Sequence, residues 1–130
     1  MILIDTSALY ALADAGDPRH AEALRIYDKL TEAGEEFVVH SYVIVETAAL
    51  LQSRSGHDAC ARFLKDVTEI GTTWVDEGLH RDAVSLLNRL KSRAISLVDC
   101  ASFILMRRRG LTTAFAFDKH FIQQGFKLAA

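Results

Sequence analysis

Residues 1–12 read MILIDTSALYAL, and this stretch decides the fold. The apolar run 1–4 has the composition of a short buried strand. Asp5 ends that run, and the apolar pattern of residues 8–12 predicts a short helix directly after it. The stretch therefore places a carboxylate at the carboxyl end of a buried strand, which is the edge where open α/β sheets bind their ligands.

Strand and helix patterns alternate along the rest of the chain. Further strands are predicted at 36–40, 72–75, 111–117 and 126–128, and helical periodicity lies between them at 18–33, 41–55, 57–70, 83–90 and 96–106. Gly110 is expected to end the last of these helices. The alternation predicts a three-layer α/β/α fold with a central, mainly parallel sheet of four or five strands.

The composition sets the class of protein. Half of the 130 residues are hydrophobic, enough for one core and too few for two ordinary domains, so we expect a single domain over 1–130. Fifteen basic against seventeen acidic residues leave a net charge of -2. The net charge therefore does not indicate a protein that binds nucleic acid or a membrane surface through an overall positive field. Any polyanion must be bound by a local group of residues.

Targeting signals and cysteine patterns are also informative. No apolar run approaches the ~20 residues that span a bilayer, and no secretory pattern precedes the first strand. Cys60 and Cys100 lie in helical apolar patterns without metal-ligand spacing. We expect a cytoplasmic protein with reduced cysteines and no membrane association.

Four acidic residues stand in otherwise apolar surroundings: Asp5, Glu46, Asp99 and Asp118. Asp5 and Asp118 each end a predicted strand, and Glu46 lies beside the apolar stripe of its helix. Asp99 follows Ser96 by three positions, so it could complete a capping box or present its charge at a cleft. Taken singly, the aspartates are equally explained as helix caps.

Together, the four acids predict a metal site. Two strand ends and two helices that each carry one acid can converge in the crevice of such a sheet. Two carboxylates about 4 Å apart repel by ~4 kcal/mol at an effective dielectric near 20, so four cannot share a cleft without cations or protons. Oxygen ligands without a His or Cys set favour Mg²⁺ or Mn²⁺ over zinc.

The same segments resemble a known family. Residues 2–9 (ILIDTSAL), 41–46 (SYVIVE), 97–99 (LVD) and 117–121 (FDKHF) look like the conserved blocks of PIN-domain nucleases, in the expected order and over essentially the whole chain. The resemblance is strongest to the VapC-like ribonuclease toxins of prokaryotic toxin-antitoxin pairs. It implies Mg²⁺-dependent endoribonuclease activity with Mn²⁺ as a substitute, an RNA substrate and a small antitoxin partner. The predicted Leu-rich helices at 8–12 and 41–55 could expose a joint apolar face, which is consistent with a homodimer and with a docked partner segment.

The resemblance also assigns roles. It places Asp5, Glu46, Asp99 and Asp118 at the family's acidic metal positions, and Thr6 or Ser7 in its supporting hydroxyl region. We take Asp5 and Asp99 as core ligands, with Glu46 and Asp118 completing the site or positioning water.

Other readings stay open at this point. A stand-alone RNA-processing nuclease, or a degenerate PIN domain that serves as a binding module, would share the fold. A phosphoryl-transfer receiver domain is disfavoured because the opening lacks an Asp-x-Asp pair and the chain has no Gly-rich phosphate loop. The basic run Arg107-Arg108-Arg109 could contact RNA, but its place in the last turn of a helix favours a structural role. We assign no catalytic histidine.

Overall fold

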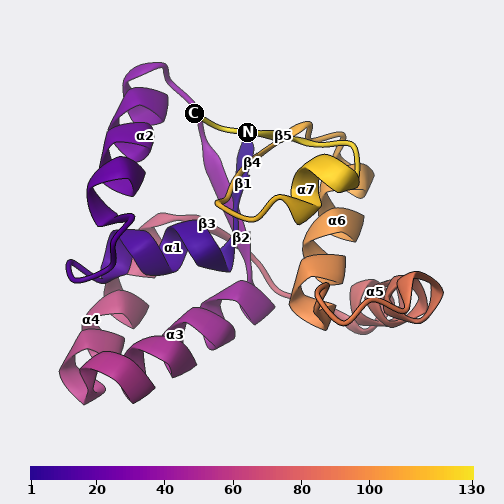
Figure 1. Cartoon of the computed structure of the whole chain (residues 1–130), viewed down its shortest axis with the longest axis horizontal. Coiled ribbons are helices and arrows are strands. Elements are labelled where there is room, and N and C mark those ends of the chain that lie inside the picture. The colour runs from indigo at the N-terminus through magenta and orange to yellow at the C-terminus, as the bar shows by residue number, and fades with distance from the viewer.

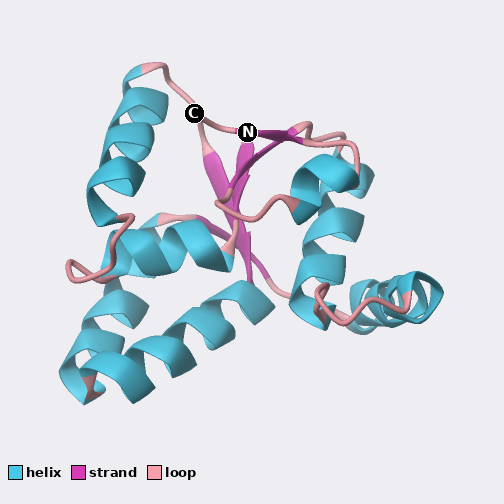
Figure 2. Cartoon of the chain, viewed as in Figure 1, coloured by secondary structure: helices cyan, strands magenta, loops and turns pink.

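Five short parallel strands form one sheet at the centre of the computed structural model, which describes residues 1–130 (Figure 2). They are β1 (Ile2–Ile4), β2 (Phe37–His40), β3 (Gly71–Thr73), β4 (Thr113–Phe115) and β5 (Lys127–Leu128). Their order across the sheet is β3-β2-β1-β4-β5. Every neighbouring pair is parallel, so the α/β prediction is confirmed with five strands.

Seven helices cover the sheet on both faces (Figure 1). They are α1 (Thr6–Ala13), α2 (His20–Glu32), α3 (Ser41–Ser55), α4 (His57–Asp66), α5 (Glu77–Leu90), α6 (Leu97–Arg109) and α7 (His120–Gln123), with a 3-10 turn at Val67–Glu69. Helices α1 to α4 lie on one side of the sheet in Figure 1, and α5, α6 and α7 lie on the other. None of the helices is long and apolar enough to cross a membrane.

Alternation along the strands divides the core into two layers. In β1, Ile2 and Ile4 pack with α1, α2 and α3, whereas Leu3 packs with α5 and α6 on the opposite face. In β4, Phe115 and Ala114 divide in the same way. Because successive side chains of a strand point to opposite faces, the continuous apolar runs of the sequence are those of strands buried on both sides.

Some element boundaries differ from the prediction. The apolar pattern 111–117 forms a strand only at Thr113–Phe115, because β1, its partner, ends at Ile4, which is in register with Phe115. The residue that caps α3 is His40, whose ring nitrogen accepts a hydrogen bond from the Val43 N–H, and Ser41 is instead the first helical residue. Gly110 ends α6 with φ 65, as expected.

The strand order reverses direction beside β1. The chain passes from β1 outward to β2 and β3, and then crosses to β4 and β5 on the other side of β1. This change of direction makes the carboxyl ends of β1 and β4 a topological switch point, where doubly wound sheets bind ligands. Asp5 follows β1, and Asp118 follows β4 by three residues.

Candidate active site

Ser7 joins the two strand ends at the switch point. Its hydroxyl donates a hydrogen bond of 2.7 Å to Asp5 Oδ2 and accepts one of 3.0 Å from the Phe117 N–H. The Asp5 N–H is bonded in turn to the carbonyl of Phe115. Asp5 also caps α1, since Oδ2 accepts from the Ser7 N–H. The first acid is therefore held in place relative to the segment that carries Asp118.

Asp99 enters the site from the first turn of α6. Its Oδ2 accepts a hydrogen bond of 2.9 Å from the Ser96 N–H, and the Ser96 hydroxyl accepts one from the Asp99 N–H. This is the capping box that the sequence offered as one reading. The same carboxylate also faces the site, so the two readings of Asp99 are compatible.

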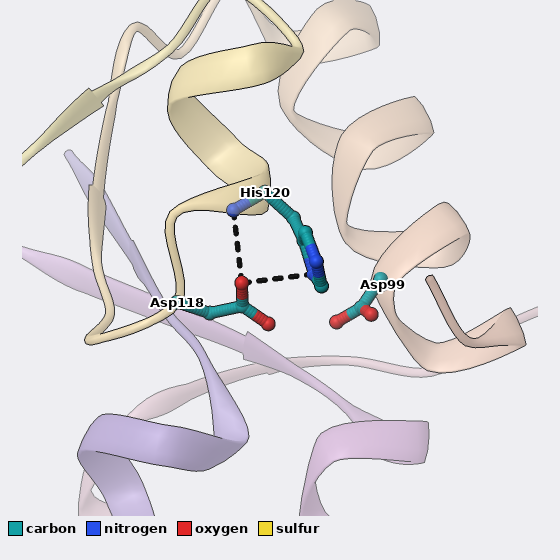
Figure 3. A group of neighbouring side chains, drawn as sticks. All are labelled: Asp99, Asp118 and His120. Atoms are coloured by element: carbon teal, nitrogen blue, oxygen red, sulfur yellow. Dashed lines mark hydrogen bonds and ion pairs between the residues drawn. The ribbon is translucent and has the colours of Figure 1, made fainter. Parts of the chain in front are cut away.

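Asp118, Asp99 and His120 form one compact group (Figure 3). Each residue offers a ligand atom, and these atoms lie within 4.8 Å of one another. Asp118 Oδ1 accepts a hydrogen bond of 2.8 Å from the His120 N–H. His120 Nδ1 lies 2.8 Å from the same oxygen but is not aligned for a hydrogen bond. Figure 3 shows the imidazole between the two carboxylates, which come from α6 and from the loop after β4.

Burial and mutual repulsion disfavour ionised carboxylates here. Burial raises the pKa of Asp5 from 3.8 to about 6; the Asp99 carboxylate also raises it, and the hydrogen bonds from Ser7 lower it. Burial raises the pKa of Asp99 too, with the Asp118 carboxylate as a smaller cause. Repulsion thus runs from Asp5 through Asp99 to Asp118, so the three acids share one electrostatic environment.

The residues present fit a divalent cation. Asp5 is only 3% exposed, and its Oδ1 is buried without a hydrogen-bond partner. A buried charged oxygen without a donor is costly, and a cation would satisfy it while removing the repulsion with Asp99. The available ligand atoms are carboxylate oxygens and one imidazole nitrogen.

The structure gives less support to Glu46 and Thr6 than to the other predicted site residues. Neither Asp5 nor Glu46 belongs to the compact group of Figure 3. The Asp99 charge acts on Asp5, whereas Glu46 is half-buried on α3 and its carboxylate makes no hydrogen bond or ion pair. The Thr6 hydroxyl is buried without a hydrogen-bond partner, so of the two candidate hydroxyls Ser7 is the one that bonds to Asp5. His120 was missed because an imidazole two residues after an acid is unremarkable until the chain turns into α7.

A groove of 340 Å³ adjoins the acids. Thr6, Ser7 and Asp118 contribute to its wall, so it shares Asp118 with the compact group. Its remaining lining residues are Tyr10, Asp17, Arg19, Leu50, Arg54 and Phe117. An acidic, cation-suited centre beside a groove with basic walls can hold a phosphodiester and activate water against it.

The family model described as "PIN domain" matches residues 2–127. The chain belongs to the PIN-domain family. This finding confirms the resemblance that the four sequence blocks carry.

Similar PIN-domain proteins come from Mycobacterium tuberculosis. The 23S rRNA-specific endonuclease VapC20 is 36% identical over 128 residues, which cover 97% of this chain and 95% of VapC20. Ribonuclease VapC26 is 30% identical over 125 residues, covering 92% and 89%. This chain is therefore a PIN-domain nuclease of the VapC type, and the predicted enzyme class is confirmed.

Solved structures agree. The crystal structure of VapC20, described as a Sarcin-Ricin loop cleaving toxin, matches with a TM-score of 0.85 and 34% identity over 97% of this chain and 96% of that one. A protein of Pyrobaculum aerophilum matches with a TM-score of 0.57 and 24% identity, covering 98% and 87%, and supports the fold alone.

Proposed function

We propose that this PIN domain is a Mg²⁺-dependent endoribonuclease of the toxin type, with Mn²⁺ as a substitute. The proposal assigns Asp5, Asp99 and Asp118 as the principal metal ligands. The observation that carries it is the convergence of these acids, from β1, α6 and the loop after β4, beside a buried carboxylate oxygen with no donor. Glu46 and His120 complete the site or position water.

The residues of the site have separate tasks in this proposal. A divalent ion bound there would lower the pKa of bound water and neutralise charge on the attacked phosphate. Asp5 is held by Ser7, and Asp99 is held by Ser96, so both carboxylates are oriented before any ligand arrives. Asp118 is fixed by the His120 N–H and reaches both the acidic group and the groove.

The names of the relatives support a proposal for the substrate class. VapC20 is described as a 23S rRNA-specific endonuclease that cleaves the Sarcin-Ricin loop. At 36% identity over nearly the full length of both chains, we propose an rRNA hairpin of this kind as the substrate of this chain as well.

Partners are part of the same proposal. A toxin requires a restraining antitoxin, and an apolar groove of 510 Å³ between α1, α2 and α4 offers a partner helix a place to dock. Leu9, Leu12, Leu24 and Phe63 are among its lining residues. A homodimer is proposed because the Leu-rich helices α1 and α3 could share an exposed apolar face.

The deciding experiment incubates purified protein with a Sarcin-Ricin hairpin and a scrambled hairpin, in Mg²⁺, Mn²⁺ or EDTA. Wild type is expected to cut the first hairpin only with metal, and Asp99→Asn is expected to lose cleavage by more than about a hundredfold. Asp28→Asn, an exposed change on α2, is the matched control. If folded wild type binds no divalent ion and cuts neither hairpin nor total RNA, the binding-module reading replaces the nuclease.

A further inference from the structure

The groove beside the acids is walled by two arginines from different elements. Arg19 precedes α2, and Arg54 lies in the last turn of α3. Both line the same 340 Å³ groove as Asp118. That volume is within the ~300–1,000 Å³ of ordinary ligand sites, so the groove has room for a ligand rather than a single water.

Aromatic rings hold both guanidinium groups in place. Arg19 Cζ lies 4.7 Å from the centre of the Phe117 ring, and Arg54 Cζ lies 5.1 Å from the centre of the Tyr10 ring. A cation over an aromatic face is attracted to it and loses part of its rotational freedom before a ligand binds. All four lining residues are thus arranged around one concave surface.

The charges of the two arginines are available to a ligand. Neither takes part in any of the four ion pairs of the chain. The groove carboxylate nearest in sequence, Asp17, accepts from the backbone N–H of Arg19 rather than from its guanidinium. The hydrogen bond from the Tyr10 hydroxyl is the main cause that lowers the pKa of Asp14, and the charge of Arg54 contributes least. Burial is the larger effect on the pKa of Tyr10 and raises it, whereas Arg54, which lies against the Tyr10 hydroxyl, helps to lower that pKa.

The more conspicuous basic run is differently placed. Arg107 donates to Gln124, Arg108 pairs with Asp82, and Arg109 donates to the Thr73 hydroxyl. Arg109 is also ten residues along α6 from Asp99, about 15 Å at the rise of an α-helix. These three arginines are occupied at the far end of the helix. Lys119 is exposed beside Asp118 but does not line the groove, so Arg19 and Arg54 are the cations of the groove itself.

We propose that Arg19 and Arg54 form a phosphate subsite, which binds the RNA backbone next to the phosphate that is cut. The inference rests on the proposed function, because it takes RNA as the ligand. An RNA chain continues on both sides of the attacked phosphate. The next phosphate along the chain must therefore lie against a surface that adjoins Asp118. Planar guanidinium donors match phosphate oxygens, and they would offset the acidic field of the site for a polyanion.

The test measures RNA binding separately from cleavage. The variants are Arg19→Gln, Arg54→Gln and the double substitution, with Arg25→Gln as the control because Arg25 is exposed on α2 and makes no ion pair or side-chain hydrogen bond. Binding of a short fluorescein-labelled single-stranded RNA is followed by anisotropy in EDTA across a range of salt. Cleavage of the Sarcin-Ricin hairpin is followed under single-turnover conditions with Mg²⁺.

The double variant is expected to bind about tenfold more weakly at low salt. The plot of log binding constant against log salt concentration has a negative slope, and the magnitude of this slope should decrease by about 1.4, since each lost phosphate contact removes about 0.7 for a single strand. In cleavage, the RNA concentration for half-maximal rate should rise by the same factor, while the maximal rate stays within about twofold. Arg25→Gln should match wild type in every measurement.

Other results would overturn the inference. If the double variant keeps the wild-type affinity and salt slope, the arginines do not bind phosphate. If it loses affinity for a glutamate-rich peptide but not for RNA, the groove binds an acidic partner instead. The proposed function fails independently: wild type that binds RNA through the arginines but cuts none would refute the nuclease and retain the subsite.

Discussion

At the scale of single residues, Asp5 is deeply buried, and one of its carboxylate oxygens has no hydrogen-bond partner. Its pKa is raised from 3.8 to about 6, so ionisation of Asp5 above pH 6 costs the folded state about 3 kcal/mol relative to the unfolded chain. Asp5→Asn removes that cost, and Asn can still accept the hydrogen bonds from Ser7. We expect the variant to gain up to about 3 kcal/mol of unfolding free energy in EDTA at neutral pH, as measured by urea denaturation.

The same substitution should abolish function. Cleavage of the hairpin and stabilisation by Mn²⁺ are both expected to disappear in Asp5→Asn, because a neutral amide is a poor ligand for a hard cation. Asp28→Asn should change neither property. A variant that loses stability in EDTA would instead assign Asp5 a purely structural role as the cap of α1.

Ser7 and Thr6 make a second matched pair. The Ser7 hydroxyl has two hydrogen-bond partners, Asp5 and Phe117, whereas the buried Thr6 hydroxyl has none. Ser7→Ala should therefore lower the free energy of unfolding by about 1–3 kcal/mol. It should also raise the pKa of Asp5, which moves the pH midpoint of Mn²⁺ binding upward. Thr6→Val should be close to neutral in urea denaturation. Equal losses in the two variants would contradict the bridging role of Ser7.

At the scale of elements, His40 links the sheet to two site-bearing helices. It ends β2 and caps α3, which carries Glu46, and its Nε2 lies 2.8 Å from the hydroxyl of Ser102 on α6, one turn after Asp99. Burial lowers the pKa of His40 from 6.5 to about 4. The neutral imidazole is thus the form that the fold accommodates.

A pH dependence of stability follows. Between pH 6.5 and 4, His40 is protonated in the unfolded chain but not in the folded chain. As pH falls, this residue therefore lowers the free energy of unfolding by up to about 3 kcal/mol. Protonation of Asp5 through pH 6 has the opposite sign and stabilises the folded apo protein as pH falls. The free energy of unfolding of wild type should therefore change little between pH 6.5 and 4.

The two contributions can be separated in urea denaturation at several pH values in EDTA. Asp5→Asn should lose stability steadily below pH 6.5, whereas Asp5→Asn combined with His40→Gln should lose less. Parallel pH profiles for these two variants would refute the assignment to His40.

Much of this arrangement is predictable from the sequence. The apolar runs that end at Asp5 and Asp118 follow directly from strands buried on both faces, and the spacing of Ser96 and Asp99 predicts the capping box that is observed. These features are local or depend on strand order, which the alternation of elements nearly determines. They were sufficient to place Asp5, Asp99 and Asp118 at one edge of the sheet, whereas the predicted Glu46 lies apart from the group.

Contacts between distant segments could not be predicted from the sequence. His40 rather than Ser41 caps α3, because the imidazole is held by Ser102, which lies 62 positions away. Arg19 and Arg54 carry no motif, and their importance arises from rings supplied by Phe117 and Tyr10. Composition drew attention to Arg107-Arg108-Arg109 instead, whose partners also become visible only in the folded chain.

At the scale of the whole molecule, the acids lie where the two halves of the core meet. Asp5 caps α1, which packs on one face of the sheet, and Asp99 lies in the first turn of α6, which packs on the other. Asp118 follows β4, which contributes to both layers. A cation that joins the three carboxylates would therefore connect elements from both faces, and its binding should stabilise the fold as a unit.

Metal should accordingly raise the melting temperature of the entire chain. At a free Mn²⁺ concentration of about 100 times Kd, binding to the folded state alone contributes about 2.7 kcal/mol, or roughly 10 °C for a chain of this size. EDTA should reverse the shift, and lowering the pH below 6 should weaken it as Asp5 takes up a proton. Asp99→Asn should fold, because Asn can still accept from the Ser96 N–H, yet show no shift. An unchanged shift in Asp99→Asn would mean that the ion binds elsewhere, since this substitution removes the charge that repels both Asp5 and Asp118.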